Sequence, residues 1–301
     1  MGSVEKGAGA FRRGALLILC GMAVIGLIDN WVVEIGKLGG LWQFHAMRAA
    51  MAVPLLILTA HLLGVNLRPT NPVGVMARTG FLASAMIIYF ASIPAMPIAL
   101  VVAGLFTSPV FVLLISALVF RERIGPIRIS AVCIGFVGVI LILNPAGASF
   151  ELSFLAPVLA GALYAMHAVA TRRYCADEPT LTLLVWFFSA LGFVGLIGTI
   201  WFSGDMSAAF HLRGWITPSP MFLFWTAVQA IGSIFGVFLL TRAYQIAAPT
   251  YMAVFEYSLL VFVSFWAWVL YQQTVGLQAA IGMALVALSG TIIARRTRTT
   301  V

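Results

Sequence analysis

Residues 97–120, PIALVVAGLFTSPVFVLLISALVF, form a stretch without a single charged side chain. A helix rises about 1.5 Å per residue, so roughly 20 residues cross a hydrocarbon core of about 30 Å. The stretch is longer than that minimum and is apolar on every side. It therefore predicts a helix that spans a membrane.

Similar stretches fill nearly the whole chain. Only 9% of the 301 residues are charged, 62% are hydrophobic, and the mean hydropathy is +1.07. No alternating pattern typical of a β-barrel recurs. We expect an all-α, multi-pass integral protein of a cell membrane, such as the inner membrane of a bacterium. The ten predicted transmembrane helices are 14–34, 42–63, 73–93, 97–119, 127–144, 153–173, 181–203, 220–241, 250–271 and 276–294.

The basic residues predict the direction of the chain. With the N-terminus in the cytoplasm, 14 of the 17 Lys and Arg residues lie on the cytoplasmic side, and Lys37, Arg48 and Arg213 lie on the other. Cytoplasmic loops carry such an excess, so both tails, 1–13 and 297–301, are expected in the cytoplasm. This bias also accounts for the net charge of +8. Because the charges form no patch, we do not expect nucleic acid as a partner.

The two halves of the chain repeat one order of features. A shift of 151 residues places Pro97–Leu143 over Ala248–Ala294, and Phe106-Thr107 over Tyr257-Ser258. The segments 14–144 and 153–296 each hold five predicted spans, joined by a link at 144–153. Because each half has an odd number of spans, the second half enters the membrane from the opposite face. We therefore expect two inverted five-helix repeats, an architecture of transporters.

Pro109 adds one expected difference between the halves. Proline removes a hydrogen bond inside a helix and predicts a kink in the fourth span. The matching position in the second half is Leu260. A kink caused by Pro109 would therefore break the symmetry of the halves.

Several of these segments resemble a known family. Pro97 through Phe111, then Arg121-Glu122-Arg123-Ile124-Gly125 and Gly135-Phe136-Val137-Gly138, resemble the end of an EamA-like half of the drug/metabolite transporter superfamily. The run Ala248 through Tyr257, followed by a span, a polar turn and Gly282 through Gly290, resembles a second such half. The resemblance covers about 14 to 296. It implies a secondary carrier that moves small metabolites, often out of the cell. The two halves of such a carrier rock around a central cavity.

Polar and ionisable side chains inside the spans are the candidates for lining such a cavity, because each is unfavourable in lipid without a partner or water. Glu256, roughly 10 Å into the ninth span by helical rise, can carry a proton or balance a cationic substrate. A structural hydrogen bond or ion pair is the alternative. The predicted cavity residues are Asp29, Asn30, His45, Arg48, Tyr89, Tyr164, His167, Gln229, Ser233, Glu256 and Tyr257.

Charges at the outer ends of the first two spans form a second group. Asp29 and Asn30 lie in the outer third of the first span, and His45 and Arg48 share one face of the second. We expect Arg48 to pair with Asp29, since both are otherwise unpaired at similar depth. The pair is either a gate or a permanent salt bridge between the two helices.

The remaining candidates each have a structural alternative. His167 shares a helix face with Tyr164 and can relay a proton, or it is satisfied by a neighbouring helix. Gln229 and Ser233 lie four residues apart and are either cavity donors or contacts between helices. Tyr89 is similar. Tyr257 either lines the cavity or packs against its neighbours.

Other classes of site are missing from the sequence. There is no G-x-x-x-x-G-K-[ST] loop, so transport driven by the chain's own ATP hydrolysis is excluded. We expect no catalytic residues, cofactor or metal, because no HExxH or G-x-S-x-G pattern occurs. Cys20, Cys133 and Cys175 match no disulfide or zinc spacing. No cleavable signal peptide is evident, since the first apolar run has the length of a span.

The sequence thus predicts a secondary transporter rather than an enzyme. Its expected partners are a small-molecule solute, the lipid bilayer and protons. Alternating access to polar or zwitterionic metabolites, with amino acids as the first candidates, fits the mixture of acidic and basic residues. The expected direction is export. The alternatives are a lipid-modifying enzyme that uses Asp29, His45 or His167, and a membrane scaffold that does not transport.

Overall fold

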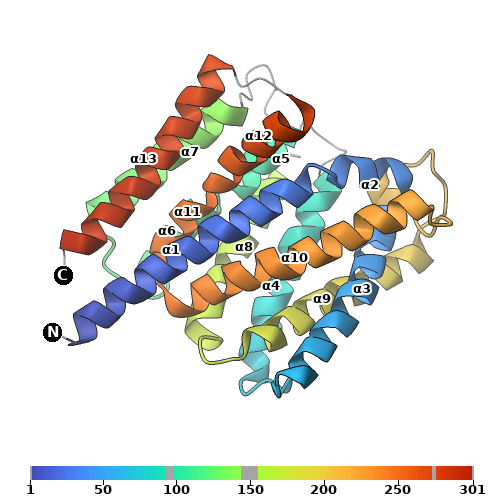
Figure 1. Ribbon diagram of the computed structural model, residues 1–301, viewed down its shortest axis with the longest axis horizontal. Coiled ribbons are helices and arrows are strands. Elements are labelled where there is room, and N and C mark those ends of the chain that lie inside the picture. The colour runs from blue at the N-terminus through green and yellow to red at the C-terminus, as the bar shows by residue number, and fades with distance from the viewer. Residues whose placement is uncertain (1, 93–97, 144–154, 273–275, 300–301) are drawn as a thin grey trace.

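The chain folds into a bundle of helices, seen from its side in Figure 1. The computed structural model describes residues 2–92, 98–143, 155–272 and 276–299. Within these ranges no strand is present. The predicted link at 144–153 and Pro97, which opens the predicted fourth span, lie outside them. The helices are α1 (Gly2–Asp29), α2 (Val32–Leu38), α3 (Leu41–Leu62), α4 (Pro72–Ser92), α5 (Ile98–Leu105), α6 (Ser108–Leu118), α7 (Pro126–Leu143), α8 (Leu155–Tyr174), α9 (Thr180–Trp201), the 3-10 helix η2 (Phe210–Leu212), α10 (Pro220–Ile246), α11 (Pro249–Glu256), α12 (Ser258–Tyr271) and α13 (Leu277–Thr299).

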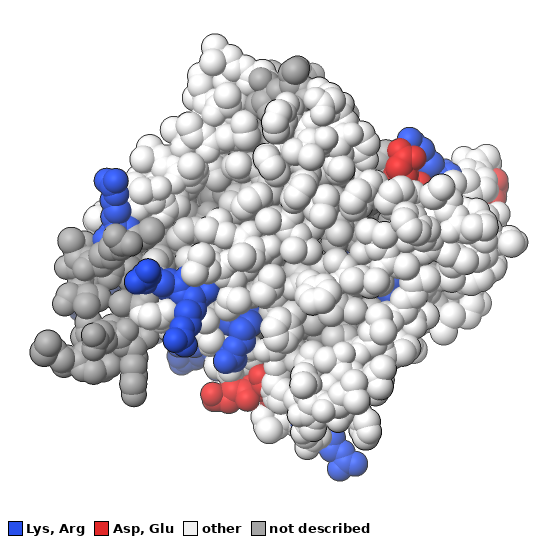
Figure 2. All heavy atoms as spheres, viewed as in Figure 1, with Lys and Arg blue, Asp and Glu red and all other residues white. Residues whose placement is uncertain are grey.

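These helices make a multi-pass membrane protein. Eight helical segments of the described chain are long and apolar enough to cross a membrane, and α13 adds a shorter apolar part, Leu277–Ile293. α8 is not among the eight. Figure 2 shows a broad band almost free of charged side chains, with Lys and Arg gathered toward the end of the bundle where both termini lie in Figure 1. Such a band can face lipid, because it carries almost no charged side chains and its helices satisfy their own backbone hydrogen bonds.

Two interruptions lie at matching places in the two halves. The fourth predicted span is divided into α5 and α6 at Phe106 and Thr107, and the ninth into α11 and α12 at Tyr257. Residues 106 and 257 are related by the shift of 151 found in the sequence. The first predicted span is also divided, into α1 and α2. The sequence analysis expected a kink at Pro109 to break the symmetry of the halves. The fourth span is divided just before this proline, but the ninth is divided at the matching place without one, so the expected asymmetry is absent.

Local hydrogen bonding explains the division of the fourth span. The Thr107 hydroxyl donates to the Gly104 carbonyl at 2.6 Å. Pro109 lies in the first turn of α6, where its missing N–H does not matter. The backbone can therefore begin a new helix at Ser108 without leaving that carbonyl unpaired.

The helix contacts follow a two-fold pattern. The most extensive pairings are α7 with α13, α3 with α9, α4 with α8, and α1 with α10. A shift by five predicted spans exchanges the α1–α10 pair with the α8–α4 pair. The same shift returns the other two pairs to themselves. Figure 1 shows α13 lying along α7, and α1 along α10.

The segment between α9 and α10 covers the end of the bundle that lies opposite the termini. The Arg213 guanidinium donates to the Gly36 and Gly39 carbonyls at 2.8 and 3.2 Å. The Trp42 indole donates to the His211 carbonyl at 2.8 Å. This segment therefore fastens α2 and the start of α3 to the second half of the chain.

A buried arginine joins four helices near the opposite end. Arg78 of α4 is fully buried and donates to the Thr171 hydroxyl of α8, the Leu183 carbonyl of α9 and the Thr241 hydroxyl of α10. All three acceptors are neutral. Arg78 was one of the 14 basic residues assigned to the cytoplasmic side, and the structure shows that its side chain lies inside the bundle.

The adjoining loops are tied together by Glu178, between α8 and α9. Its carboxylate accepts hydrogen bonds from the Thr70 hydroxyl and the Asn71 amide, both at 2.6 Å. Desolvation opposes the charge, but these bonds outweigh it and hold the pKa of the Glu178 carboxyl below its ordinary value. The Gln245 side chain donates to the Cys175 and Glu178 carbonyls, so the end of α10 is fixed to the same loop.

The contact between α7 and α13 depends on two glycines. A Cβ atom at Gly138 would lie 2.7 Å from the Gly282 carbonyl oxygen, and one at Gly282 would lie 2.6 Å from the Gly138 carbonyl oxygen. Backbone atoms cannot yield as the end of a side chain can. Only glycine therefore allows these two helices to approach so closely.

We predict that Gly138→Ala lowers the free energy of unfolding by about 1–3 kcal/mol, because the added methyl group forces α7 away from α13. Gly80→Ala is the matched control, since a Cβ atom there has nothing within 4 Å. That change should stabilise the protein by about 0.5–1 kcal/mol through helix propensity. Denaturant titration in detergent measures both, and equal effects of the two substitutions would contradict the close contact.

We predict that Arg78→Ala lowers the free energy of unfolding by about 2–4 kcal/mol, because it leaves a void and three buried acceptors without their donor. Arg242→Ala, at an exposed position of α10, should change it by less than about 0.5 kcal/mol. Thermal melts of both variants test this. An unchanged melting temperature for Arg78→Ala would show that the four helices do not depend on this side chain.

Candidate functional site

A cavity of about 140 Å³ lies between helices from both halves of the chain. One water needs roughly 10–15 Å³ of such space, so the cavity can hold several waters or a small solute. Most of its wall is apolar, with polar groups at a few points. The polar and aromatic lining residues are Asp29, Arg48, Tyr89, Phe90, Phe106, Ser108, Tyr164, His167, Phe187, Gln229, Ser233, Thr241 and Glu256.

Eight of the eleven residues predicted for the site lie on this wall: Asp29, Arg48, Tyr89, Tyr164, His167, Gln229, Ser233 and Glu256. The structure does not place the other three there. The Asn30 amide donates to the Gly26 carbonyl at 2.7 Å. His45 is buried behind Arg48. Tyr257, at the division between α11 and α12, packs with Phe106 and Val139 in a separate apolar cluster.

Glu256 is held by two tyrosines from two other helices. The carboxylate oxygen Oε1 accepts a hydrogen bond from the Tyr244 hydroxyl of α10 at 2.7 Å and from the Tyr164 hydroxyl of α8 at 3.0 Å. The side chain is 2% exposed. Neither bond uses the second oxygen, Oε2. The wall of the cavity therefore presents a carboxyl group with one oxygen already occupied.

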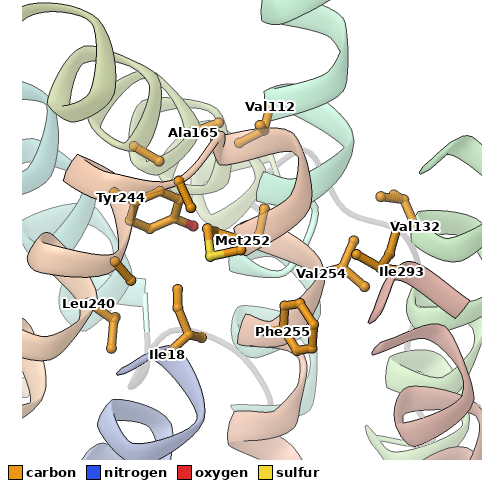
Figure 3. Packing of buried hydrophobic residues seen from close by; sticks show 14 of the residues in the cluster. Ile18, Val112, Val132, Ala165, Leu240, Tyr244, Met252, Val254, Phe255 and Ile293 are labelled. Carbon is orange, nitrogen blue, oxygen red and sulfur yellow. The ribbon is translucent and has the colours of Figure 1, made fainter. Parts of the chain in front are cut away.

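Packing fixes the Tyr244 ring in place. The side chain is fully buried and belongs to a cluster with Ile18, Leu240 and Met252, which Figure 3 shows around the ring. Its hydroxyl can therefore reach Glu256 from one direction only. Dense apolar packing around a hydrogen-bonding group holds it in one geometry.

His167 lies beside these tyrosines rather than against the carboxylate. Its ring centre is 5.4 Å from that of Tyr164 and 6.4 Å from that of Tyr244. One turn further along α8, Thr171 accepts a hydrogen bond from Arg78. The predicted face of Tyr164, His167 and Thr171 thus runs from the cavity to the buried arginine.

Asp29 and Arg48 lie on the same wall, within electrostatic reach of each other. The expected contact between them is not formed. Within the described part of the chain, the exposed Lys37 and Glu34 form an ion pair within 4.0 Å, but Asp29 and Arg48 do not. The Arg48 guanidinium instead lies 3.2 Å from His45 Nδ1, and its Nε atom has no partner.

The Arg48 guanidinium also lies over two aromatic rings. Its central carbon is 4.9 Å from the centre of the Phe44 ring and 5.7 Å from that of Phe188. Aromatic faces attract cations. These rings support the charge together with the more distant Asp29. Because no carboxylate of the described residues lies within 4.0 Å of it, Arg48 is able to meet an anionic group.

Sequence reasoning missed Tyr244 and Thr241. Thr241 was the last residue of the eighth predicted span, 220–241, and Tyr244 was placed at its inner end, whereas α10 continues to Ile246. The two residues are three apart, which places them on one face of a helix. Tyr244 is twelve residues before Glu256, and the chain turns back between them at Pro249. A polar helix face just before such a turn was the sequence signal that could have identified Thr241 and Tyr244 as site residues.

Metal chemistry has no evident basis in the part of the chain that is described. Ranges 2–92, 98–143, 155–272 and 276–299 contain no group of three or more His, Cys, Asp or Glu side chains placed to hold an ion. Solute binding at the cavity is the chemistry that the arrangement supports.

Known proteins similar to this chain are transporters. Residues 12–144 match the EamA-like transporter family. A riboflavin transporter of Brucella anthropi is 25% identical over 71% of this chain and 72% of its own length. The pseudopaline exporter CntI of Pseudomonas aeruginosa is 26% identical over 93% of this chain and 97% of its own. These names indicate transport rather than catalysis.

A solved structure shares the fold. A protein known by its crystal structure superposes with a TM-score of 0.80 over 93% of this chain and 97% of the other, at 19% identity. The resemblance predicted from the sequence is confirmed: residues 12–144 match the EamA-like transporter family, within a multi-pass membrane protein whose relatives are named transporters.

Proposed function

We propose that this protein is a secondary transporter that moves small polar or zwitterionic metabolites across the cell membrane by alternating access. The observation that carries the proposal is the cavity, whose wall combines helices of both halves with the charged residues Asp29, Arg48 and Glu256. A binding site between two repeats is the usual arrangement of secondary transporters.

The architecture that we propose is ten transmembrane helices in two inverted five-helix repeats, 14–144 and 153–296. Three observations support it: the sequence shift of 151, the matching divisions at residues 106 and 257, and the two-fold exchange of helix pairs. We place both termini in the cytoplasm. The distribution of Lys and Arg supports this, as do the two termini at one end of the bundle.

The charges of the wall favour a solute with both an acidic and a basic group. Arg48, which lacks a carboxylate partner within 4.0 Å, suits an acid, and Glu256 suits a base. Amino acids have both groups and remain our first candidates. We propose export as the direction, since a relative that matches 93% of the chain is named an exporter.

The energy source that we propose is a proton gradient. Glu256 is a buried carboxyl group on the cavity wall and is able to gain and lose a proton. Ionisable residues at such depth are typical of proton pathways. No nucleotide-binding loop is present to provide energy from ATP.

We predict exchange of labelled amino acids across proteoliposomes that contain the protein. Ser233→Trp fills the cavity and should reduce exchange at least tenfold. Ile231→Trp is the control, because this neighbour on α10 is 51% exposed on the outer surface and should leave exchange unchanged. Failure to exchange any amino acid, nucleoside or vitamin by folded protein would reject the carrier and favour an enzyme or a scaffold.

We predict that an imposed pH difference accelerates transport by the wild type and has no effect on Glu256→Gln, because the amide cannot take up a proton. Glu122→Gln changes an exposed carboxyl group in the turn before α7 and should retain the full response. The initial rate of uptake at several pH differences measures both. A wild-type response in Glu256→Gln would assign coupling to another residue.

A further inference from the structure

We infer that Tyr164 and Tyr244 are positioning residues that direct the free oxygen of Glu256 at a cationic ammonium group of the solute. The inference rests on the proposed function and names the chemical group that this part of the cavity binds. It begins with the unequal use of the two carboxylate oxygens. Both tyrosine hydroxyls donate to Oε1, and no hydrogen bond to Oε2 is formed by the described residues.

The two donors reach Glu256 from separate helices. Tyr164 lies on α8 and Tyr244 on α10, while Glu256 ends α11. Two hydrogen bonds from fixed points prevent rotation of the carboxyl group about its last bond. Because Glu256 lines the cavity, Oε2 is the oxygen left available to a bound solute.

The surroundings of Glu256 lack the positive charge that a buried carboxylate needs. Among the described residues, no Lys or Arg lies within 4.0 Å of it. Arg78 donates its hydrogen bonds to Thr171, Leu183 and Thr241 instead. His167 contacts the tyrosine rings. Neutral hydroxyl donors alone leave a buried charge incompletely balanced.

Asp29, the other carboxyl group of the wall, is in a different position. It lies within electrostatic reach of Arg48. An incoming cation therefore finds its strongest complement at Glu256. An ammonium group brings both the missing charge and an N–H donor for Oε2, and charge-assisted bonds of this kind are stronger than neutral ones.

Matched pairs of small solutes test the inference with purified protein in detergent. Methylammonium, butylammonium and phenethylammonium are each compared with the alcohol of the same skeleton in thermal melts. We expect at least one ammonium ion to stabilise the wild type where its alcohol does not. Glu256→Gln should abolish the difference. Equal effects of ions and alcohols on the wild type, or none from any ion, would overturn the inference.

The tyrosines are tested by removing only their hydroxyl groups. Tyr164→Phe and Tyr244→Phe should each weaken the apparent affinity for the ammonium ion by about tenfold, as expected for loss of a hydrogen bond to a charged group. Tyr251→Phe is the control, because Tyr251 lies on α11 but faces Arg128. Unchanged affinity in both cavity variants would reject their positioning role.

Infrared difference spectra separate positioning from a general loss of structure. Addition of the ammonium ion should shift the carboxylate stretching band of the wild type. The band should be absent in Glu256→Gln and displaced in Tyr244→Phe. The displacement can be measured even if Tyr244→Phe is less stable than the wild type. An identical band in Tyr244→Phe and the wild type would contradict the inference.

The two proposals fail differently. Exchange of solutes in proteoliposomes without preference for ammonium groups would leave the carrier in place and reject the cation site. Binding of ammonium ions that depends on Glu256, with no exchange of any solute, would retain the site and reject the carrier.

Discussion

Hydrocarbon cannot form hydrogen bonds, and the rest of this structure depends on that constraint. Backbone groups satisfy themselves within helices, but ionisable side chains must find partners or water inside the bundle. The chain has few of them, and Asp29, Arg48 and Glu256 all meet at one cavity. The face of the molecule drawn in Figure 2 has a band almost free of charged side chains.

The interrupted helices connect this constraint to the cavity. Phe106 and Ser108 border the division in the first half, Glu256 and Leu259 border the division in the second, and all four residues line the wall. A break in a helix exposes backbone groups, which is tolerated at membrane depth only within protein or beside water. The two divisions therefore occur where the bundle is hollow.

Much of the architecture and part of the site could be predicted from the sequence. Apolar runs bounded by Gly, Pro and charged residues located the helices, because every span must be long enough to cross the hydrocarbon core. The divisions within the first and ninth spans were not predicted. Glu256, Tyr164 and His167 were found because polar side chains are conspicuous in apolar runs. The sequence could not show that Tyr257 turns into an apolar cluster or that Arg78 is buried, since both depend on how separate helices pack. The division at Tyr257 also has no proline to announce it.

Arg78 has a consequence for any motion between the halves. Its three hydrogen bonds run from α4 to α8, α9 and α10. One side chain of the first half is therefore hydrogen-bonded to three helices of the second. Separation at this end must break all three bonds within a short displacement, whereas the opposite end is fastened through the Arg213 contacts. Opening on the Arg78 side would then require the bonds of one guanidinium group and the neighbouring Glu178 contacts to break together, which makes it a cooperative step.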